Sequence, residues 1–278
     1  MDRDTGSDSP APPNVGTTGS GAAPVQLRYV GEVALITLNR PEAGNSINEP
    51  MATELIRIAT RIAQEGCASA LVMTGQGKLF CGGGDLIGFR SAANQGADAL
   101  GRHVRSLAER LHEALAALLD LRLPWVSAVN GSAAGAGLSL VLASDIAFAR
   151  PGAKFAAAYA ELGLAADGGM SWWLPRRIGH ARAVEMILGS RRLTAAEARE
   201  IGLISAVIDD AEESFLSSVI DCARNLCRGT QDSRAASLAL LREGASRSLA
   251  DQLTFEAVAM GDLAGSDWVR ASILALSQ

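Results

Sequence analysis

Apolar residues along the chain alternate between short runs and helical stripes, and this pattern predicts strands and helices in turn. Short runs bounded by turn-forming residues predict strands, with Gly31 at the turn between the first two. These strands are expected at residues 25–29, 33–38, 70–74, 125–129 and 145–149. Because helical patterns separate most of them, the chain is expected to have an α/β fold.

Two long stripes with a helical period lie between these runs. The first begins near Pro50, with Asn48 as its N-cap and Gly66 just past its end. Its apolar face is formed by Met51, Leu55, Ile58 and Ile62. The second covers residues 98–119, and its apolar face is formed by Leu100, Val104, Leu107, Leu111, Leu115 and Leu118. Both stripes predict helices packed on the core by one face.

The two ends of the chain differ from this pattern. Residues 1–24 are rich in Gly, Ser, Thr, Pro and Asp, and are predicted to be a disordered tail. After residue 181 the pattern is mostly helical, and Thr194 to Glu197 form a capping box. Helices are expected at 211–228, 231–243, 248–262 and 267–276. The predicted organisation is therefore a tail (1–24), an α/β core (25–205) and a C-terminal helical region (206–278).

Composition narrows the possible partners. Hydrophobic residues make up 48% of a 278-residue chain whose formal net charge is -5, so there is no basic footprint for nucleic acid. No apolar run reaches a membrane-spanning length, and the first residues do not resemble a secretory signal. The four cysteines lack metal-ligand spacing. We interpret them as reduced thiols of a cytoplasmic protein that binds neither nucleic acid nor membrane.

Two glycine-rich turns, 80–85 and 130–137, carry the first indication of chemistry. The first reads Phe-Cys-Gly-Gly-Gly-Asp and the second Asn-Gly-Ser-Ala-Ala-Gly-Ala-Gly, and each lies between a predicted strand and a predicted helix. Backbones without Cβ atoms can approach a ligand closely, and the free amides of a helix start can donate to one oxygen. The pair therefore predicts an oxyanion hole for a thioester or another carbonyl group.

These turns, with three further segments, resemble the crotonase (enoyl-CoA hydratase/isomerase) superfamily over residues 25–278. The matching segments are Leu38 to Pro41 with Asn45, Phe80 to Asp85, Pro124 to Asp145, Phe155 to Gly179, and Leu193 to Leu203. The resemblance implies a crotonase-like spiral of ββα units with a C-terminal helical trimerisation region. It also implies a homotrimer or a dimer of trimers acting on an acyl-CoA thioester, without a metal and with coenzyme A only as part of the substrate. The thioester oxygen would be held by the amides of Gly82 and Ala136.

The resemblance also bears on the reaction. Hydratases of this family use two glutamates, and the corresponding positions here are Ser139 and Tyr159. Instead, Asp167 lies in a Gly163–Gly169 loop that resembles the loop of 1,2-epoxyphenylacetyl-CoA isomerases and 2,4-dienoyl-CoA isomerases, in which an aspartate moves a proton. The apolar neighbours Leu164, Ala165 and Ala166 are expected to keep water from this carboxylate.

The expected function is an acyl-CoA isomerase that shifts a double bond by proton transfer through a thioester enolate. Asp167 would carry the proton, and the amides of Gly82 and Ala136 would stabilise the enolate oxygen. The expected substrate-binding residues are Arg40, Gly84, Asp85, Leu86, Gly135, Ser139 and Tyr159. Arg40 is the expected partner of a CoA phosphate.

Other readings stay open at this stage. One is a hydratase with an unusual acid and base set, formed by Glu161 or Tyr159 with water. Another is a crotonase-like protein that binds acyl-CoA without turnover. The purely structural interpretation of Asp167 is that it forms an Asx turn. The aspartate also resembles the nucleophile of 4-chlorobenzoyl-CoA dehalogenase, which carries a histidine base. His103 and His112 lie on the 98–119 helix and not at the matching glycine turn, which disfavours dehalogenation.

Overall fold

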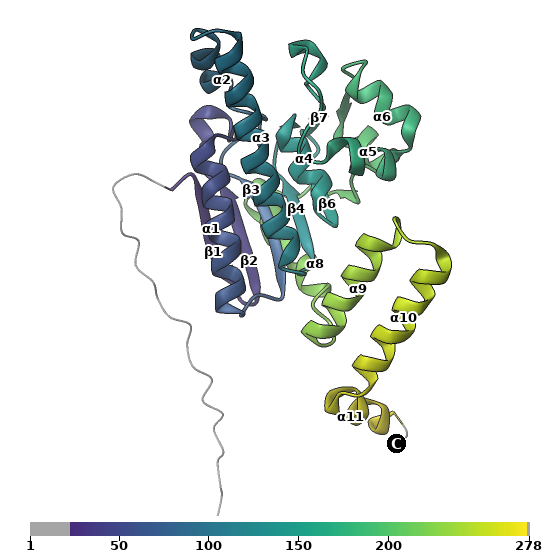
Figure 1. Cartoon of the computed structure of the whole chain (residues 1–278). Coiled ribbons are helices and arrows are strands. Elements are labelled where there is room, and N and C mark those ends of the chain that lie inside the picture. Colours follow the sequence, from purple (N-terminus) through teal and green to yellow (C-terminus); the bar gives the residue numbers. More distant parts are fainter. Residues whose placement is uncertain (1–22, 277–278) are drawn as a thin grey trace, which may run out of the picture.

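The computed structural model describes residues 23–276, and the chain runs from a mixed sheet to a series of C-terminal helices (Figure 1). The predicted disordered tail lies outside the described residues except for its last two positions. There the carbonyls of Ala23 and Pro24 accept hydrogen bonds from the Asn39 side-chain amide at 3.0 Å and from the Asn39 backbone amide at 2.8 Å. These bonds fix the entry into the first strand.

The main sheet has six strands in the order β1-β2-β3-β4-β6-β9. They are β1 (Val25–Val30), β2 (Val33–Leu38), β3 (Ala70–Gly75), β4 (Trp125–Val129), β6 (Ile146–Ala149) and β9 (Ala206–Val207). The first two strands pair in antiparallel fashion and the others are parallel. All five predicted strands are confirmed within one or two residues.

Both faces of the sheet are covered at its centre, which explains why β3 and β4 are buried along their whole length. Ile36 and Met73 belong to the cluster under α1 (Glu49–Glu65) and α3 (Ala97–Asp120). Their strand neighbours Leu35 and Val72 belong to a second cluster, with side chains of α8 (Glu212–Asn225). Since β9 and α8 complete the sheet and its second helical layer, the packed core continues to residue 225, past the predicted end at 205.

A smaller sheet carries the glycine turns. It consists of β5 (Ala133–Ala134), β7 (Lys154–Ala156) and β8 (Arg192–Thr194), with β5 parallel and β8 antiparallel to β7. A parallel bridge between Cys81 and Ala133 joins the first turn to β5. The two turns, about fifty residues apart in sequence, therefore lie side by side at the end of the parallel strands, where sites of α/β proteins form.

The remaining elements are short and follow these sheets. They are η1 (Pro41–Ala43), α2 (Leu86–Ala93), α4 (Ala136–Ala143), η2 (Ala160–Leu162), α5 (Met170–Ile178), α6 (His180–Ile187) and α7 (Ala195–Glu200). The predicted caps are confirmed: Asn48 accepts a bond from the Met51 amide at 3.0 Å, and Thr194 with Glu197 forms a reciprocal capping box ahead of α7. None of the described helices is long and apolar enough to cross a bilayer.

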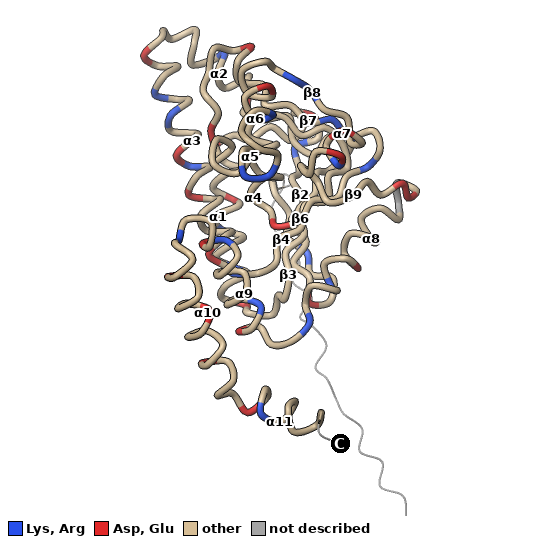
Figure 2. Tube along the Cα trace, turned by 90° about the vertical axis from the view of Figure 1, so that its right-hand side faces the viewer, with Lys and Arg blue, Asp and Glu red and all other residues tan. Residues whose placement is uncertain are grey.

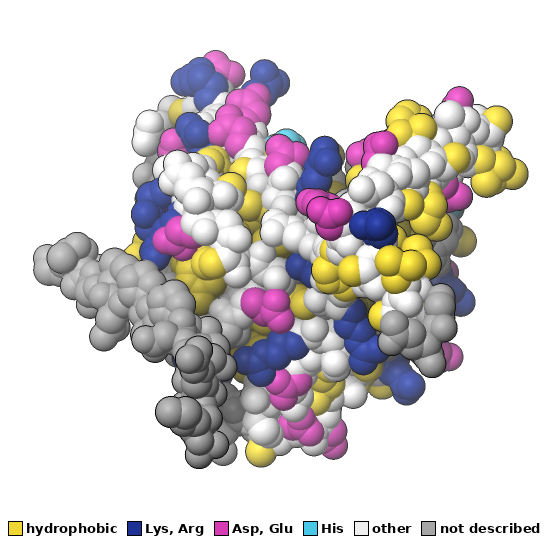
Figure 3. Space-filling model, turned by 90° about the horizontal axis from the view of Figure 1, so that it is seen from below, with side chains coloured by type: hydrophobic (Ala, Val, Ile, Leu, Met, Phe, Trp, Pro, Cys, Tyr) yellow, Lys and Arg dark blue, Asp and Glu magenta, His cyan; other side chains and the backbone are white. Residues whose placement is uncertain are grey.

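The last three helices project from the rest of the molecule (Figure 2). They are α9 (Gln231–Gly244), α10 (Leu249–Ala264) and α11 (Asp267–Ala275), close to the predicted ranges. Hydrophobic side chains gather on this projecting arm in the space-filling view (Figure 3). Among them are Leu253, which is 55% exposed, and Met260, which is 72% exposed. Charged residues of both signs are distributed along the whole trace (Figure 2).

Candidate active site

The site is built where the two glycine turns touch. A Cβ atom placed on Gly83 would lie 3.6 Å from the Gly135 Cα, and one placed on Gly137 would lie 2.3 Å from the Cys81 carbonyl oxygen. Gly135 has a φ of 52°, and the Ala134 amide donates to the Cys81 carbonyl at 3.0 Å. A side chain on Gly137 would clash with the first turn and one on Gly83 would crowd the second, while Gly135 adopts a left-handed φ that favours glycine, so this contact depends on all three residues.

The amides beside this contact correct one of the predicted donors. The Gly82 amide donates to the Gly44 carbonyl at 2.9 Å, so it is already engaged and does not serve a substrate oxygen. The Gly84 amide has no hydrogen bond within the described part of the chain. Ala136 is the first residue of α4, where helix geometry leaves the amide without a partner. Gly84 and Ala136 each follow one of the two touching glycines, so they are the pair placed to share one oxygen.

Asp167 is held by the two residues that occupy the hydratase glutamate positions, one at its carboxylate and one at its backbone carbonyl. The Tyr159 hydroxyl donates to Asp167 Oδ1 at 2.5 Å, and the Ser139 hydroxyl donates to the Asp167 backbone carbonyl at 2.9 Å. Both partners are buried, Ser139 completely. Burial, reinforced by the adjacent Asp167 charge, raises the pKa of the Tyr159 phenol well above its usual value. The phenol is therefore a hydrogen-bond donor at neutral pH and does not act as an anionic base.

His112 also reaches this loop, which the sequence did not lead us to expect. Its Nε2 accepts a hydrogen bond from the Gly168 amide at 3.1 Å, although the two residues are 56 positions apart. Helix α3 runs past the loop and brings the imidazole to the residue next to Asp167. His112 lies on the predicted helix and not at the matching glycine turn, yet its imidazole contacts the loop that carries Asp167.

The structure changes two expectations about the surroundings of Asp167: the shielding of its carboxylate by apolar neighbours, and Glu161 as a candidate base. Leu164 is 37% exposed and Ala165 is also exposed, so these two side chains do not shield the carboxylate, while Ala166 is partly buried. The side chains that form hydrogen bonds with the loop are Tyr159, Ser139 and His112. Glu161 is exposed and forms an ion pair with Arg192 at 3.2 Å. An exposed, paired carboxylate is a poor candidate for the base of a hydratase.

The predicted CoA partner Arg40 is occupied inside the fold. Its guanidinium forms an ion pair with Asp85 at 3.2 Å and donates to the Ser46 carbonyl at 2.6 Å, and its side chain is only 18% exposed. Asp85 also caps α2 by accepting a bond from the Ile87 amide at 3.0 Å. Arg40 and Asp85 therefore shape the first glycine turn, and the structure argues against a phosphate-binding role for Arg40. Leu86, at the start of α2, is 57% exposed and available for contact.

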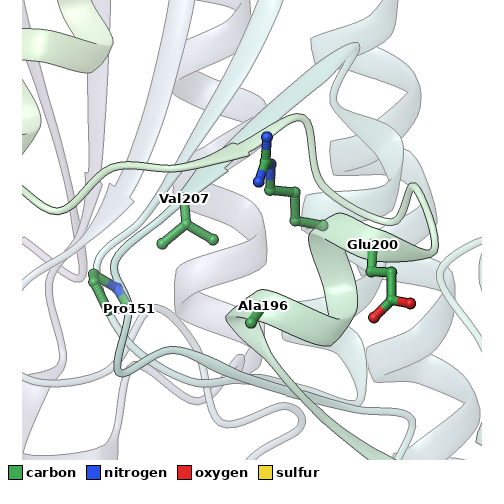
Figure 4. A pocket seen from close by; sticks show the side chains of 5 residues that line it. Pro151, Ala196, Glu200 and Val207 are labelled. Atoms are coloured by element: carbon green, nitrogen blue, oxygen red, sulfur yellow. The ribbon is translucent and has the colours of Figure 1, made fainter.

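Other groups take no part in the site. Burial raises the pKa of the Cys81 thiol to about 12, so this residue stays protonated, and all four cysteines are free. Among residues 23–276, no three His, Cys, Asp or Glu side chains gather as a metal site. A cavity of about 520 Å³ beside α7 and β9 is lined by Pro151, Ala196, Arg199, Glu200 and Val207 (Figure 4). A larger one, of about 1030 Å³, lies between α5 and α9, and neither cavity includes Asp167.

Comparison with known proteins decides the family. The model of the family described as enoyl-CoA hydratase/isomerase matches residues 29–276. The chain belongs to the enoyl-CoA hydratase/isomerase family. A solved structure of an enoyl-CoA hydratase from Polaromonas sp. JS666 matches with a TM-score of 0.82 at 27% identity, covering 91% of this chain and 96% of that one. The predicted crotonase-like α/β fold with a C-terminal helical region is thereby confirmed.

Relatives within the enoyl-CoA hydratase/isomerase family carry three kinds of name. A protein of Rhodobacter capsulatus named "Probable enoyl-CoA hydratase" is 37% identical, covering 87% of this chain and 90% of its own. The 1,2-epoxyphenylacetyl-CoA isomerase of Escherichia coli is 37% identical, covering 76% and 77%. A 4-chlorobenzoyl coenzyme A dehalogenase of an Arthrobacter species is 31% identical, covering 81% and 80%. Membership thus gives acyl-CoA chemistry, and the reaction itself has to be argued from the site.

Proposed function

We propose that this family member is an acyl-CoA isomerase that shifts a double bond by proton transfer. The Asp167 carboxylate removes a proton from the carbon next to the thioester, and the electron pair moves onto the thioester oxygen as an enolate. The amides of Gly84 and Ala136 donate to that oxygen, and each such donor typically lowers a barrier by about 2.7–4 kcal/mol. The protonated Asp167 then returns the proton to the γ-carbon, so substrate and product are isomers and no separate cofactor is needed.

The observation that carries this proposal is the replacement of both hydratase glutamates. Ser139 and Tyr159 stand at those positions, neither offers a carboxylate, and both hold Asp167. A single carboxylate on a loop that is bonded to α4, the helix that begins at Ala136, is suited to taking and returning one proton. Hydration requires in addition a group that activates water.

The Asp167→Ala variant tests the role of the carboxylate. Turnover of a 3-enoyl-CoA should fall about 10³-fold or more, since general acid–base catalysis typically contributes 10²–10⁴-fold and no second carboxylate is at hand. Binding of a non-reactive acyl-CoA, measured by calorimetry, should stay within about threefold of wild type. Asp167→Asn is the matched variant, because its amide oxygen can still accept the Tyr159 bond. Retention of isomerase turnover in either variant would refute the assignment.

The substrate assay separates isomerisation from the other readings. Purified protein is incubated with crotonyl-CoA and with a 3-enoyl-CoA, and products are separated by chromatography. Conversion of the 3-enoyl-CoA without hydration of crotonyl-CoA supports the isomerase. A 3-hydroxyacyl-CoA product would instead support a hydratase, in agreement with the Rhodobacter capsulatus relative's name. Tight binding without any product would support a non-catalytic acyl-CoA-binding protein.

A second candidate, hydrolytic dehalogenation of an aryl-CoA, is favoured by the position of His112. An Asp167 oxygen would attack the ring carbon that bears the halogen, chloride would leave, and water would hydrolyse the resulting aryl ester. His112 Nε2 accepts the Gly168 amide, so it would take the proton of that water only after this bond opens. Release of chloride from 4-chlorobenzoyl-CoA tests this reaction directly. His112→Gln should limit chloride release to about one equivalent per active site if dehalogenation is the function, because the aryl ester then accumulates, and should leave double-bond isomerisation active if it is not.

We further propose that the protein is cytoplasmic and assembles as a homotrimer or a dimer of trimers through its C-terminal helices. The exposed apolar side chains of α10 and α11 support a subunit contact there. The four free cysteines are consistent with a reducing compartment.

A further inference from the structure

We propose that Tyr159 and Ser139 are positioning residues that orient Asp167, so that Oδ1 is held by the phenol and Oδ2 is the oxygen that carries the proton. This inference rests on the proposed function and adds the residues that prepare its base. It gives one shared task to the two positions that bear glutamates in hydratases. In this chain Ser139 and Tyr159 stand there, and both hold Asp167, which carries the proton in place of the glutamates.

The geometry of the loop supports this assignment from three sides. Tyr159, just before η2, binds the carboxylate itself, whereas Ser139 on α4 binds the backbone carbonyl of the same residue. On the far side, His112 on α3 accepts a bond from the next amide, that of Gly168. The Met170 amide at the start of α5 also donates to the Asp167 carbonyl, at 3.1 Å. The loop is thus tied to four elements, while Oδ2 has no hydrogen bond within the described part of the chain.

Tyr159 is suited to this role because its environment fixes it as a donor. The residue is 8% exposed, and its burial keeps the phenol protonated. A short bond from a neutral donor to a carboxylate stabilises the ionised form and restricts rotation of the carboxyl group. Both effects favour a base that is ready to accept a proton through one defined oxygen.

The chain offers a matched control for removing this hydroxyl. It contains only two tyrosines, and the other, Tyr29, also donates to a carboxylate at 2.5 Å, that of Glu65 on the far end of α1. Tyr159→Phe and Tyr29→Phe therefore delete the same kind of bond, and only the first touches the proposed base.

Steady-state kinetics of Tyr159→Phe test the proposal. Without the donor the carboxyl group holds its proton to higher pH, so the acidic limb of the kcat profile should move upward by about one pH unit. We expect kcat to fall about 10- to 100-fold at neutral pH, with KM changed less than about threefold. Tyr29→Phe should match wild type. An unmoved acidic limb, or an equal change in both variants, would overturn the proposal.

Among the described residues, the titratable side chains that form hydrogen bonds with this loop are Tyr159 and His112. The profile is therefore repeated in a His112→Gln background, which removes the imidazole. A shift caused by Tyr159 should persist there. A shift that disappears would belong to His112 and would contradict the assignment.

An infrared titration keeps this test separate from that of the proposed function. The difference spectrum between wild type and Asp167→Asn reports the Asp167 carboxyl group without any turnover. Its midpoint should rise in Tyr159→Phe. In a Tyr29→Phe background, fluorotyrosine labels Tyr159 alone, and its more acidic phenol should lower the midpoint even if Tyr159→Phe folds poorly. Absence of isomerase activity in wild type would refute the function alone, whereas unmoved midpoints would refute the positioning role.

Discussion

At the scale of single residues, the absence of a side chain at position 168 decides how closely the loop that carries Asp167 approaches α4. Gly168 has a φ of 58°, and a Cβ atom there would lie 2.7 Å from the Ser139 Cβ. Gly163, in the same loop, has a φ of 68° but nothing within 4 Å of its Cβ position. The two glycines share a left-handed backbone and differ in whether a neighbour blocks a side chain.

This difference predicts distinct effects of the two alanine substitutions. Gly163→Ala should lower the free energy of unfolding by about 1 kcal/mol, which is the cost of the left-handed conformation. Gly168→Ala should lower it by about 2–4 kcal/mol, because the clash with Ser139 is added. It should also reduce kcat about tenfold or more by displacing Asp167. Urea denaturation and kinetics check both; equal unfolding energies for the two variants would contradict the packing argument.

How far the site could be predicted also depends on single residues. The two glycine turns stand out in the sequence as a local pattern, whereas Asp167 and Ala136 are singled out only through the resemblance to the family. The choice of Gly84 over Gly82 cannot be made from the sequence, because it depends on the hydrogen bond that the Gly82 amide already donates to the Gly44 carbonyl. The approach of His112 is also hidden, because its neighbour Gly168 is distant in sequence and no periodicity reports such a contact.

At the scale of elements, the length of a helix or strand decides whether the sequence predicts it. Helices α1 and α3 extend over several turns, so their apolar stripes are unambiguous. The strands β5, β7, β8 and β9 have only two or three residues each. Such strands are too short to show a two-residue alternation, and they exist because the neighbouring turns offer hydrogen-bond partners.

One arginine connects the C-terminal helices to the sheet. Arg242 on α9 forms an ion pair with Asp145 at 2.8 Å and also donates to the carbonyls of Leu119 and Leu123. Asp145 in turn accepts a bond from the Trp125 amide at the start of β4. The guanidinium thus ties α9 to the C-terminal end of α3 and, through Asp145, to the start of β4.

Removal of this connection should be measurable as a loss of stability. Arg242→Ala is expected to lower the free energy of unfolding by about 2–3 kcal/mol, since several charge-assisted bonds are lost and the Asp145 carboxylate loses its partner. Arg57→Ala is the control, because its ion pair with Glu54 lies on the surface, with the Arg57 side chain 62% exposed. That variant should lose less than about 0.5 kcal/mol. Similar losses in both variants would show that α9 is not anchored through Arg242.

At the scale of the whole molecule, the core and the projecting arm differ in how they bury apolar surface. The sheet is covered on both faces, by α1 and α3 and by α8. In contrast, α10 contacts α9 and α11, and none of the side chains of α10 or α11 is buried in the single chain. An amphipathic helix with exposed leucine, valine and methionine is stable in water only when something covers it. In the proposed trimer, a second copy of the chain covers this apolar surface.

Changing this face should therefore alter the assembly. Light scattering coupled to gel filtration should give a trimer or a multiple of it for the wild-type 28.8 kDa chain. Leu253→Asp places a charge on a side chain that is 55% exposed on α10 and should shift the population toward monomer. Thr254→Asp adds the same charge at the neighbouring exposed position without removing apolar surface, and should remain trimeric. Monomeric wild type would exclude the assembly, and an oligomeric Leu253→Asp protein would place the contact on another face.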